Sequence, residues 1–259
     1  KISREFKNLT IINSHIEGTV EVTDLPMNMH SFSVQENMMS GTFDFKSLPE
    51  YMAVLNIRKN FFSGSLDIEN LPRRLEILNV SYNTFSGPLR FSSLPETMKE
   101  FLIEGNNFYG KIRFGRVFQS LHIFAARENK LDGEICPREL QCNNILIAKN
   151  SLSGKVKFSD FFYGVVLLDL SQNNFCGSID LSALPGSLVE MNLSKNAFSG
   201  ELKLDKLPNG LQKLNLADNR LVGIIDIGMV PISLRELNIS RNRFEGKLKR
   251  GHLVVENMP

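Results

Sequence analysis

The chain has 259 residues, of which 42% are hydrophobic and 22% charged, and this composition excludes a disordered or collagen-like protein. Thirty basic and 28 acidic residues leave a formal net charge of +2, so no global charge draws the chain to nucleic acid or to an anionic membrane. The longest nearly apolar stretch, residues 161–168, is far shorter than the ~20 residues that a membrane helix needs. We therefore expect no membrane span. We also read the chain, which begins at Lys1, as a fragment of a longer protein.

An internal repeat runs along the whole chain. Residues 75–87 read LEILNVSYNTFSG, residues 188–200 read LVEMNLSKNAFSG, and residues 234–246 read LRELNISRNRFEG. The recurring Asn of each unit is Asn37, Asn60, Asn83, Asn106, Asn129, Asn150, Asn173, Asn196, Asn219 or Asn242, with Ser14 in its place in the first unit. Every step is 23 residues except the step of 21 from Asn129 to Asn150. A Gly follows each of these positions by four residues, from Gly18 to Gly246, which gives the pattern LxxLxLxxNxLxG.

This pattern resembles the leucine-rich repeat, and the resemblance covers essentially the whole chain. The 23-residue form, with an F-S-G step and a following L-P, is similar to repeats in leucine-rich repeat proteins of trypanosomatid-type protists and partly to the plant-type S-G repeat. The resemblance implies a leucine-rich repeat solenoid, a β-rich arc with a parallel concave sheet, second short strands and turns on the convex side, and few long helices. We expect residues 1–259 to form a single domain of about eleven repeats, without evident terminal caps.

Elementary physics favours the same architecture. The L-x-L core of each unit alternates with the period of a strand, and equal spacing lets successive strands stack in parallel about 4.8 Å apart. The recurring Asn falls where the chain turns inward, and its amide can pair backbone groups that would otherwise be buried without partners, which predicts an asparagine ladder. A Phe recurs at one phase and predicts a stacked aromatic spine in the core, made of Phe62, Phe85, Phe108, Phe175, Phe198 and Phe244.

Residues that carry catalysis do not converge in this pattern. The four histidines lie in separate units, at His15, His30, His122 and His252, and no glycine-rich phosphate loop occurs, because the turns account for the glycines. The three cysteines, Cys136, Cys142 and Cys176, do not have C-x-x-C zinc spacing. We therefore expect no enzyme, no cofactor, no metal site and no small-molecule substrate.

The sequence alone does not determine the cellular compartment of the protein. A disulfide between Cys136 and Cys142, which flank the shortened unit, is one alternative. The odd cysteine count and the lack of a cysteine-rich cap favour a reducing, intracellular compartment over secretion or the cell surface. Sequons for N-glycosylation occur at Asn8, Asn79, Asn192 and Asn238, but the recurring L-N-x-S strand text generates three of them, so glycosylation stays open too.

The candidate binding surface is the concave face, onto which residues six and four positions before each Asn point. These residues are polar in the last three units. Each strand from the third to the eighth unit instead presents an apolar residue, at Val54, Ile77, Leu102, Ile123 with Ala125, Leu146 and Leu167. Such an apolar band commonly marks an interaction surface, although strand propensity without a partner would also explain it. Charged residues at the strand ends could form its polar rim or could simply be solvated: Arg58, Lys59, Glu104, Arg127, Glu128 and Lys149.

Two further deviations have alternative interpretations. Phe118, Gln141 and Phe162 replace the recurring Pro in units five to seven, which indicates either a specialised central segment or repeat decay with compensating packing. The last unit is basic, but no aromatic residues are interleaved with its charges, so we expect a solvated end and no nucleic-acid site. The basic residues are Arg235, Arg241, Arg243, Lys247, Lys249 and Arg250.

The leading hypothesis is a non-enzymatic protein–protein interaction module that binds a partner on the concave face through the central apolar band. One alternative is an extracellular or cell-surface ligand-binding ectodomain. Another is a structural or scaffold component of a larger assembly, which could self-associate through the unpaired edges of its terminal strands. The sequence does not encode the identity of the partner.

Overall fold

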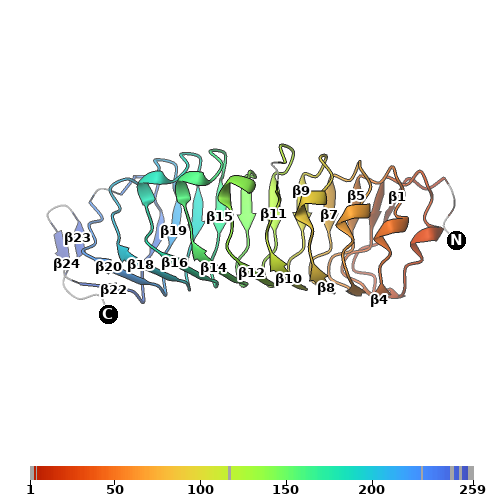
Figure 1. The fold of residues 1–259 in the computed structure, drawn as a ribbon, viewed down its shortest axis with the longest axis horizontal. Coiled ribbons are helices and arrows are strands. Elements are labelled where there is room, and N and C mark those ends of the chain that lie inside the picture. The colour runs from red at the N-terminus through yellow and green to blue at the C-terminus, as the bar shows by residue number, and fades with distance from the viewer. Residues whose placement is uncertain are drawn as a thin grey trace. The chain divides into compact units, whose positions relative to one another are not determined.

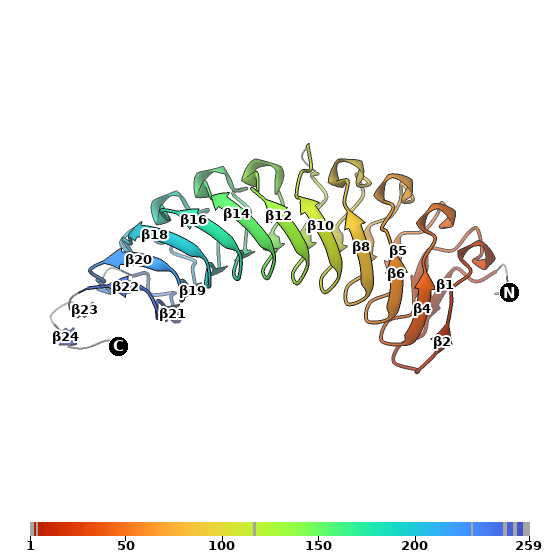
Figure 2. The same ribbon diagram turned by 60° about the horizontal axis from the view of Figure 1, so that its bottom comes forward.

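The computed structural model describes residues 3, 5–115, 118–228, 230–245, 248–250 and 253–255. The chain divides into two compact units, unit 1 (Lys1–Asp132) and unit 2 (Gly133–Pro259). Within each unit, every repeat adds one strand to a first parallel sheet and one strand to a second (Figures 1 and 2). The described residues contain short 3-10 helices and no α-helix. The predicted leucine-rich repeat solenoid is thus confirmed, while its continuity as one domain stays a prediction.

Unit 1 contains the first six repeats. Its first sheet consists of β1 (Asn8–Thr10), β3 (Ser31–Ser33), β5 (Val54–Asn56), β7 (Ile77–Asn79), β9 (Glu100–Leu102) and β11 (Ile123–Ala125). Its second sheet consists of β2 (Glu17–Gly18), β4 (Met38–Thr42), β6 (Phe61–Gly64), β8 (Thr84–Pro88), β10 (Asn107–Lys111) and β12 (Lys130–Gly133). The 3-10 helices follow the second strands, at η1 (Val22–Asp24), η2 (Phe45–Ser47), η3 (Ile68–Asn70) and η4 (Phe91–Ser93).

Unit 2 repeats the arrangement. Its first sheet consists of β13 (Asn144–Leu146), β15 (Leu167–Asp169), β17 (Glu190–Asn192), β19 (Lys213–Asn215) and β21 (Glu236–Asn238). Its second sheet consists of β14 (Ser151–Lys155), β16 (Asn174–Gly177), β18 (Ala197–Glu201), β20 (Arg220–Gly223) and β22 (Arg243–Phe244). The 3-10 helices are η5 (Pro137–Glu139), η6 (Phe158–Asp160) and η7 (Leu181–Ala183).

The end of the chain departs from the repeat. An antiparallel pair, β23 (Leu248–Arg250) and β24 (Leu253–Val255), follows β22, and the repeat pattern did not predict it. The last recurring glycine, Gly246, and one basic residue, Lys247, lie outside the described residues. The structure describes no side chain from residue 246 onward, so the basic-end prediction extends only to Arg235, Arg241 and Arg243.

The asparagine ladder is present in both units and explains why the Asn recurs. Asn83 is buried, its Oδ1 accepts the Phe62 N–H at 3.0 Å, and its Nδ2 donates to the Ile57 and Val80 carbonyls at 3.0 and 3.1 Å. Asn219 makes the corresponding bonds in unit 2, where its Oδ1 accepts the Phe198 N–H at 3.0 Å. One amide thus pairs donors and acceptors of two successive repeats, which no apolar side chain of that size could do.

A left-handed residue precedes each ladder position, a feature that the repeat pattern did not reveal. Its φ lies between 49° and 61° in every unit. Only the fifth repeat has a glycine at this position, Gly105. The other repeats carry Asn13, Glu36, Lys59, Tyr82, Glu128, Lys149, Gln172, Lys195, Asp218 and Arg241. The ladder bonds hold these residues in a backbone region that normally favours glycine.

Five of the six predicted spine residues are buried in the core between the two sheets, whereas Phe244 is half-buried. Phe85 stacks on Phe108 in unit 1 with ring centroids 6.4 Å apart, and Phe175 stacks on Phe198 in unit 2 at 6.3 Å. All four side chains are fully buried. Unit 1 adds a second aromatic cluster, built from Phe91, Phe101, Phe114, Phe118 and Phe124.

Phe118, which replaces the recurring Pro, packs in the core of its own repeat. It is 4% exposed and its ring lies 5.8 Å from that of Phe114. The Leu121 N–H donates to the Phe118 carbonyl at 3.3 Å, as the Met98 N–H does to the Pro95 carbonyl at 3.1 Å. The turn therefore forms without proline, and the lost rigidity is offset by aromatic packing.

Candidate binding surface on the first sheet

The outer face of the first sheet is the side turned away from the Phe spine, where residues six and four positions before each ladder Asn lie. In β5, β7 and β9 the central residue is buried while its neighbours on the outer face keep partial exposure. Val54, Ile77, Leu102 and Ile123 are all half-buried on this face. Ala125 also lies there but is only 1% exposed, so it offers a partner almost no surface.

The register divides the predicted band of unit 1 into two rows. Val54, Ile77, Glu100 and Ile123 stand opposite one another on β5, β7, β9 and β11. In the second row, Leu102 stands between Asn79 and Ala125. The apolar surface is therefore not a straight stripe, because it steps from the first row to the second at β9, and a carboxylate stands at that step.

Leu146 and Leu167 belong to unit 2. Both are half-buried on its first sheet, on β13 and β15. The register places Leu146 opposite Asp169 and Leu167 opposite Glu190, so each leucine has an acidic neighbour across the ladder. In unit 2 the predicted apolar surface accordingly consists of these two residues.

The side chain four positions before the ladder Asn closes a turn with the backbone in many repeats. Asn79 Oδ1 accepts the Ser81 N–H at 3.1 Å, and Asp169 Oδ1 accepts both the N–H and the hydroxyl of Ser171, at 3.2 and 2.7 Å. The same backbone bond is made by Asn56, Asn79, Asp169, Asn192, Asn215 and Asn238. Leu102, Ala125 and Leu146 have no acceptor and cannot close this turn.

These turns also explain the recurring sequons. In Asn192 and Asn238 the Oδ1 accepts the N–H and the hydroxyl of the sequon serine, Ser194 or Ser240. The Asn of the N-x-S text thus has a structural role in closing the turn, irrespective of glycosylation, and the serine hydroxyl adds a second bond in these two repeats. Asn8 is exposed on β1.

Charged residues line the carboxyl ends of the strands in unit 1, and they pair with one another. Glu36 Oε1 lies 3.1 Å from Arg58 Nη1 and 2.9 Å from Lys59 Nζ, and Arg58 also stacks over the Tyr82 ring at 5.3 Å. Hydrogen bonding and the positive charge of Lys59 lower the pKa of Glu36. One carboxylate thus pairs with two cations, and this part of the rim keeps one positive charge.

A second pair, Glu104 with Arg127, continues the rim. Their side chains lie 3.5 Å apart, and both are largely covered. Burial raises the pKa of Glu104, and the Arg127 guanidinium opposes that shift. The remaining predicted rim residues, Glu128 in unit 1 and Lys149 in unit 2, are exposed in the left-handed position before the ladder Asn.

The opposite ends of the strands are paired as well. Lys99 Nζ lies 2.6 Å from Glu76 Oε2, just before β9 and β7. The apolar residues of unit 1 are thus flanked on both sides by ion pairs. This arrangement matches the polar rim of a protein interface around an apolar centre.

The outer face of unit 2 is polar beyond β15. Lys213 Nζ lies 3.4 Å from Glu190 and 3.7 Å from Glu236, which are the cross-strand neighbours of Lys213 on β17 and β21. Asn192, Asn215 and Asn238 form the second row, with their acceptors engaged in turns. Charged and amide groups that satisfy each other leave little apolar surface for a partner.

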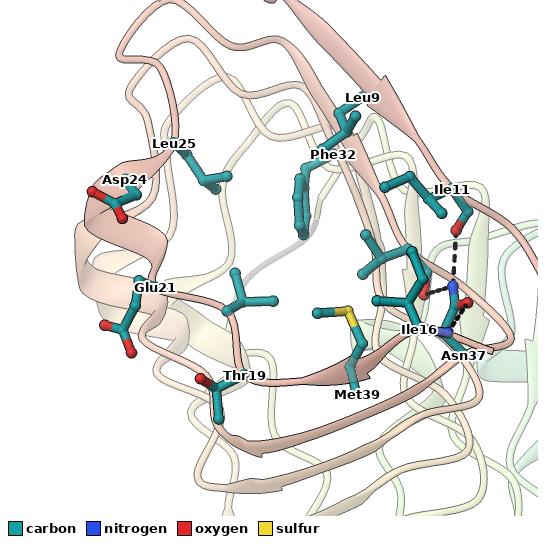
Figure 3. Close-up of a pocket in the computed structure, with 12 residues that line it drawn as sticks. Leu9, Ile11, Ile16, Thr19, Glu21, Asp24, Leu25, Phe32, Asn37 and Met39 are labelled. Atoms are coloured by element: carbon teal, nitrogen blue, oxygen red, sulfur yellow. Dashed lines mark hydrogen bonds between the residues drawn. The ribbon is translucent and has the colours of Figure 1, made fainter. Parts of the chain in front are cut away.

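A cavity of about 320 Å³ lies inside the first repeats of unit 1 (Figure 3). It is lined by side chains of both sheets, among them Leu9, Phe32, Val34, Ile16 and Met39. Ile16 and Met39 occupy the positions where later repeats carry the spine Phe, and these slimmer side chains leave the interior unfilled. We interpret the cavity as a packing defect at the start of the core. The sequence indicates it, because Ile16 and Met39 replace the recurring Phe in these two repeats.

The described residues contain no disulfide, no metal-binding cluster and no membrane-spanning helix. Cys136, Cys142 and Cys176 are free thiols, and Cys142 is buried in the core. The described part of the chain contains no cluster of three His, Cys, Asp or Glu side chains that could hold a metal ion. None of its helices has the length and apolar character that crossing a membrane requires.

Comparison with known proteins agrees with the fold. The leucine-rich repeat family model matches residues 233–251. No curated protein sequence matches the chain. Among solved structures, the plant peptide hormone receptor RGFR1 in complex with RGF2 superposes with a TM-score of 0.80 at 23% identity, covering 89% of this chain and 39% of the receptor chain.

Two further structures are similar. The ectodomain of the Arabidopsis receptor kinase HAESA, in complex with an extended IDA peptide hormone, has a TM-score of 0.72 at 23% identity and covers 94% of this chain and 47% of that one. A plant ice-binding protein has a TM-score of 0.76 at 23% identity, covering 92% and 81%. The chain therefore spans less than half the length of the two receptor chains.

Repeat text, ladder and sheet topology together define a parallel β-solenoid of the leucine-rich repeat class. The chain has the fold of a leucine-rich repeat solenoid. Its finer resemblance to protist or plant-type repeats stays a prediction.

Proposed function

We propose that the chain is a non-enzymatic protein-binding module and that the outer face of unit 1 carries its principal binding site. One observation carries the proposal: Ile77, Leu102 and Ile123 form half-buried apolar surface on a rigid sheet, inside a rim of ion pairs that neutralise one another. An uncharged apolar centre with a polar rim suits a protein better than a nucleic acid, whose phosphates call for excess positive charge.

The solved structures support the same class of function. RGFR1 and HAESA carry peptide hormones in their complexes, so this solenoid fold can serve as a peptide-binding platform. The strands β5, β7, β9 and β11 share a parallel ladder, so a partner would meet a preformed surface and would lose little binding energy to ordering it.

Site-specific photocrosslinking tests the proposal. A photoreactive phenylalanine analogue is placed at Ile77 on the outer face or, as a matched control, at Tyr109 on the second sheet, where the side chain is 50% exposed. In extracts of the native source we expect a discrete crosslinked protein from position 77 that is absent from position 109. The crosslink should disappear when Ile123→Asp is added, with folding checked by circular dichroism.

Equal crosslinking from both faces, or a crosslink that survives Ile123→Asp in a folded protein, would contradict the proposal. Ile123 is suited to this test because its side chain is half-buried on the surface while the neighbouring Phe124 carries the core packing.

A further inference from the structure

Glu100 is the charged residue within the apolar surface of unit 1. It stands directly between Ile77 on β7 and Ile123 on β11, in the row that begins with Val54. The other outer-face residues at this register and at the neighbouring one in unit 1 are uncharged, from Asn8 and Thr10 on β1 to Ile123 and Ala125 on β11. A carboxylate here interrupts an otherwise continuous apolar row.

Glu100 also differs from the acids around it in having no cation. Glu36 pairs with Arg58 and Lys59, Glu76 pairs with Lys99, and Glu104 pairs with Arg127. No basic nitrogen of the described residues lies within ion-pair distance of the Glu100 carboxylate. The neighbouring cation, Lys99, is already engaged 2.6 Å from Glu76.

An apolar partner that covered Ile77 and Ile123 would also remove Glu100 from water. A carboxylate that is desolvated without a counter-charge costs far more free energy than the adjoining apolar contacts return. A partner that carries a cation at this point avoids that cost and gains a charge-assisted hydrogen bond. The carboxylate therefore selects against neutral partners and in favour of basic ones.

A second group on the outer face, the backbone N–H of Glu104, indicates that the partner is an extended peptide. In repeats with an Asn turn, the N–H two residues after the turn residue meets that outer-face side chain, as the Ser81 N–H meets Asn79. Leu102 offers no acceptor, and the Glu104 N–H makes no hydrogen bond to another described residue. A donor that no described residue accepts, beside an apolar side chain, suits the carbonyl oxygen of an extended peptide.

We propose that the partner of this surface is an extended peptide segment that places a Lys or Arg side chain on Glu100, between apolar residues that pack on Ile77 and Ile123. The inference rests on the proposed function and names the chemistry of its ligand. A carbonyl of the same segment accepts the Glu104 N–H.

Selection from a random-peptide library displayed on phage tests this inference on the full chain. Peptides that bind the wild-type protein but not the Ile77→Asp variant are bound at the outer face. We expect Lys or Arg flanked by apolar residues to be enriched among them. The enrichment should vanish when the selection is repeated on Glu100→Gln, and it should persist on the matched control Glu69→Gln, whose carboxylate lies on η3, outside the first sheet, and already pairs with Arg90.

Binding measurements with one selected peptide then give the contribution of its Lys to the affinity. Replacing its Lys by norleucine should weaken binding to the wild-type protein at least about tenfold and should change binding to Glu100→Gln by less than about twofold. Peptides enriched without a basic residue, or a loss of equal size on both proteins, would overturn the inference while leaving the proposed function intact. If no peptide is enriched in an Ile77-dependent manner and position 77 gives no crosslink, the proposed function itself fails.

The donor is tested by a matched pair of substitutions at one position. Leu102→Asn can accept the Glu104 N–H as Asn79 accepts that of Ser81, whereas Leu102→Gln has the same amide on a side chain one methylene too long. We expect Leu102→Asn to bind a selected peptide about fivefold more weakly than Leu102→Gln, because only Asn withdraws the donor. Slower hydrogen exchange of the Glu104 amide in Leu102→Asn would verify that the turn has closed. Equal binding by the two variants would remove the carbonyl contact from the proposal.

Discussion

The two units share one interior and differ on the outer face of the first sheet. Asn83 in unit 1 and Asn219 in unit 2 make the same ladder bonds, and Phe pairs stack in both cores. On the outer face, unit 2 places Lys213 between two glutamates, whereas unit 1 places Glu100, which has no cation among the described residues, between two isoleucines. The interior is therefore set by what every repeat must satisfy, and the outer face is free to differ because no backbone group depends on most of its side chains.

The largest predicted effect concerns the interior and should be equal in the two units. Asn83→Ala and Asn219→Ala each leave several buried backbone groups without partners, and each should lower the free energy of unfolding by about 2–4 kcal/mol. Urea denaturation followed by circular dichroism measures the loss. A much smaller loss for one of the two would show that the ladder does not carry the same weight in both units.

The second prediction is that substitutions at the left-handed position before the ladder Asn affect stability differently in the two units. Gly105 has φ +61°, and a Cβ at this position would overlap the Tyr82 ring, so Gly105→Ala should destabilise unit 1 by about 1–3 kcal/mol. The corresponding residue in unit 2, Lys195, is held at φ 55° with its side chain exposed. Lys195→Gly should therefore change stability by less than about 1 kcal/mol. Thermal denaturation of both variants checks the difference, and similar losses would mean that the Tyr82 contact is unimportant.

Exchanging the outer-face turn should move stability in opposite directions. Asp169→Ala removes two hydrogen bonds from unit 2 and should cost about 1–2 kcal/mol. Leu102→Asn introduces the missing turn in unit 1 and should contribute about 0.5–1 kcal/mol. Denaturant midpoints of the two variants measure both effects. A destabilised Leu102→Asn protein would indicate that Leu102 packs for stability and is not held open for a partner.

The smallest predicted effect is a pH dependence confined to unit 1. Burial raises the pKa of Glu104 in the folded state above its unfolded value. The stability linked to this group is therefore complete below the unfolded pKa and is lost as the pH rises through the folded pKa. Glu104→Gln removes that loss, so its stability relative to wild type should be higher at about pH 7 than at about pH 4. Urea titrations at the two pH values measure the difference, and an offset that does not change with pH would contradict the assigned shift.

Much of the fold could be predicted because each repeat restates the same physical requirement. The spacing of Asn83 and its counterparts indicated the ladder, and Phe85 and Phe108 at one phase indicated a stacked core. The left-handed residue before each Asn could not be predicted, since Tyr82, Lys195 and Asp218 share no side-chain property and are held there by ladder bonds. The antiparallel pair of β23 and β24 could not be predicted either, because it lies where the repeat ends and the repeat pattern no longer applies.

The sequence by itself determined the repeat, its strands, its ladder and the face on which variable residues gather, because these follow from local spacing. It did not determine which outer-face residues stand side by side. Only the register showed that Glu100 lies between Ile77 and Ile123, that Leu102 belongs to a different row, and that Ala125 is covered. Cross-strand neighbours are more than 20 residues apart in the chain, and the pairing of one charge with another depends on side-chain reach across strands. The tertiary structure therefore decided which acid on this surface has no cation among the residues that the structure describes.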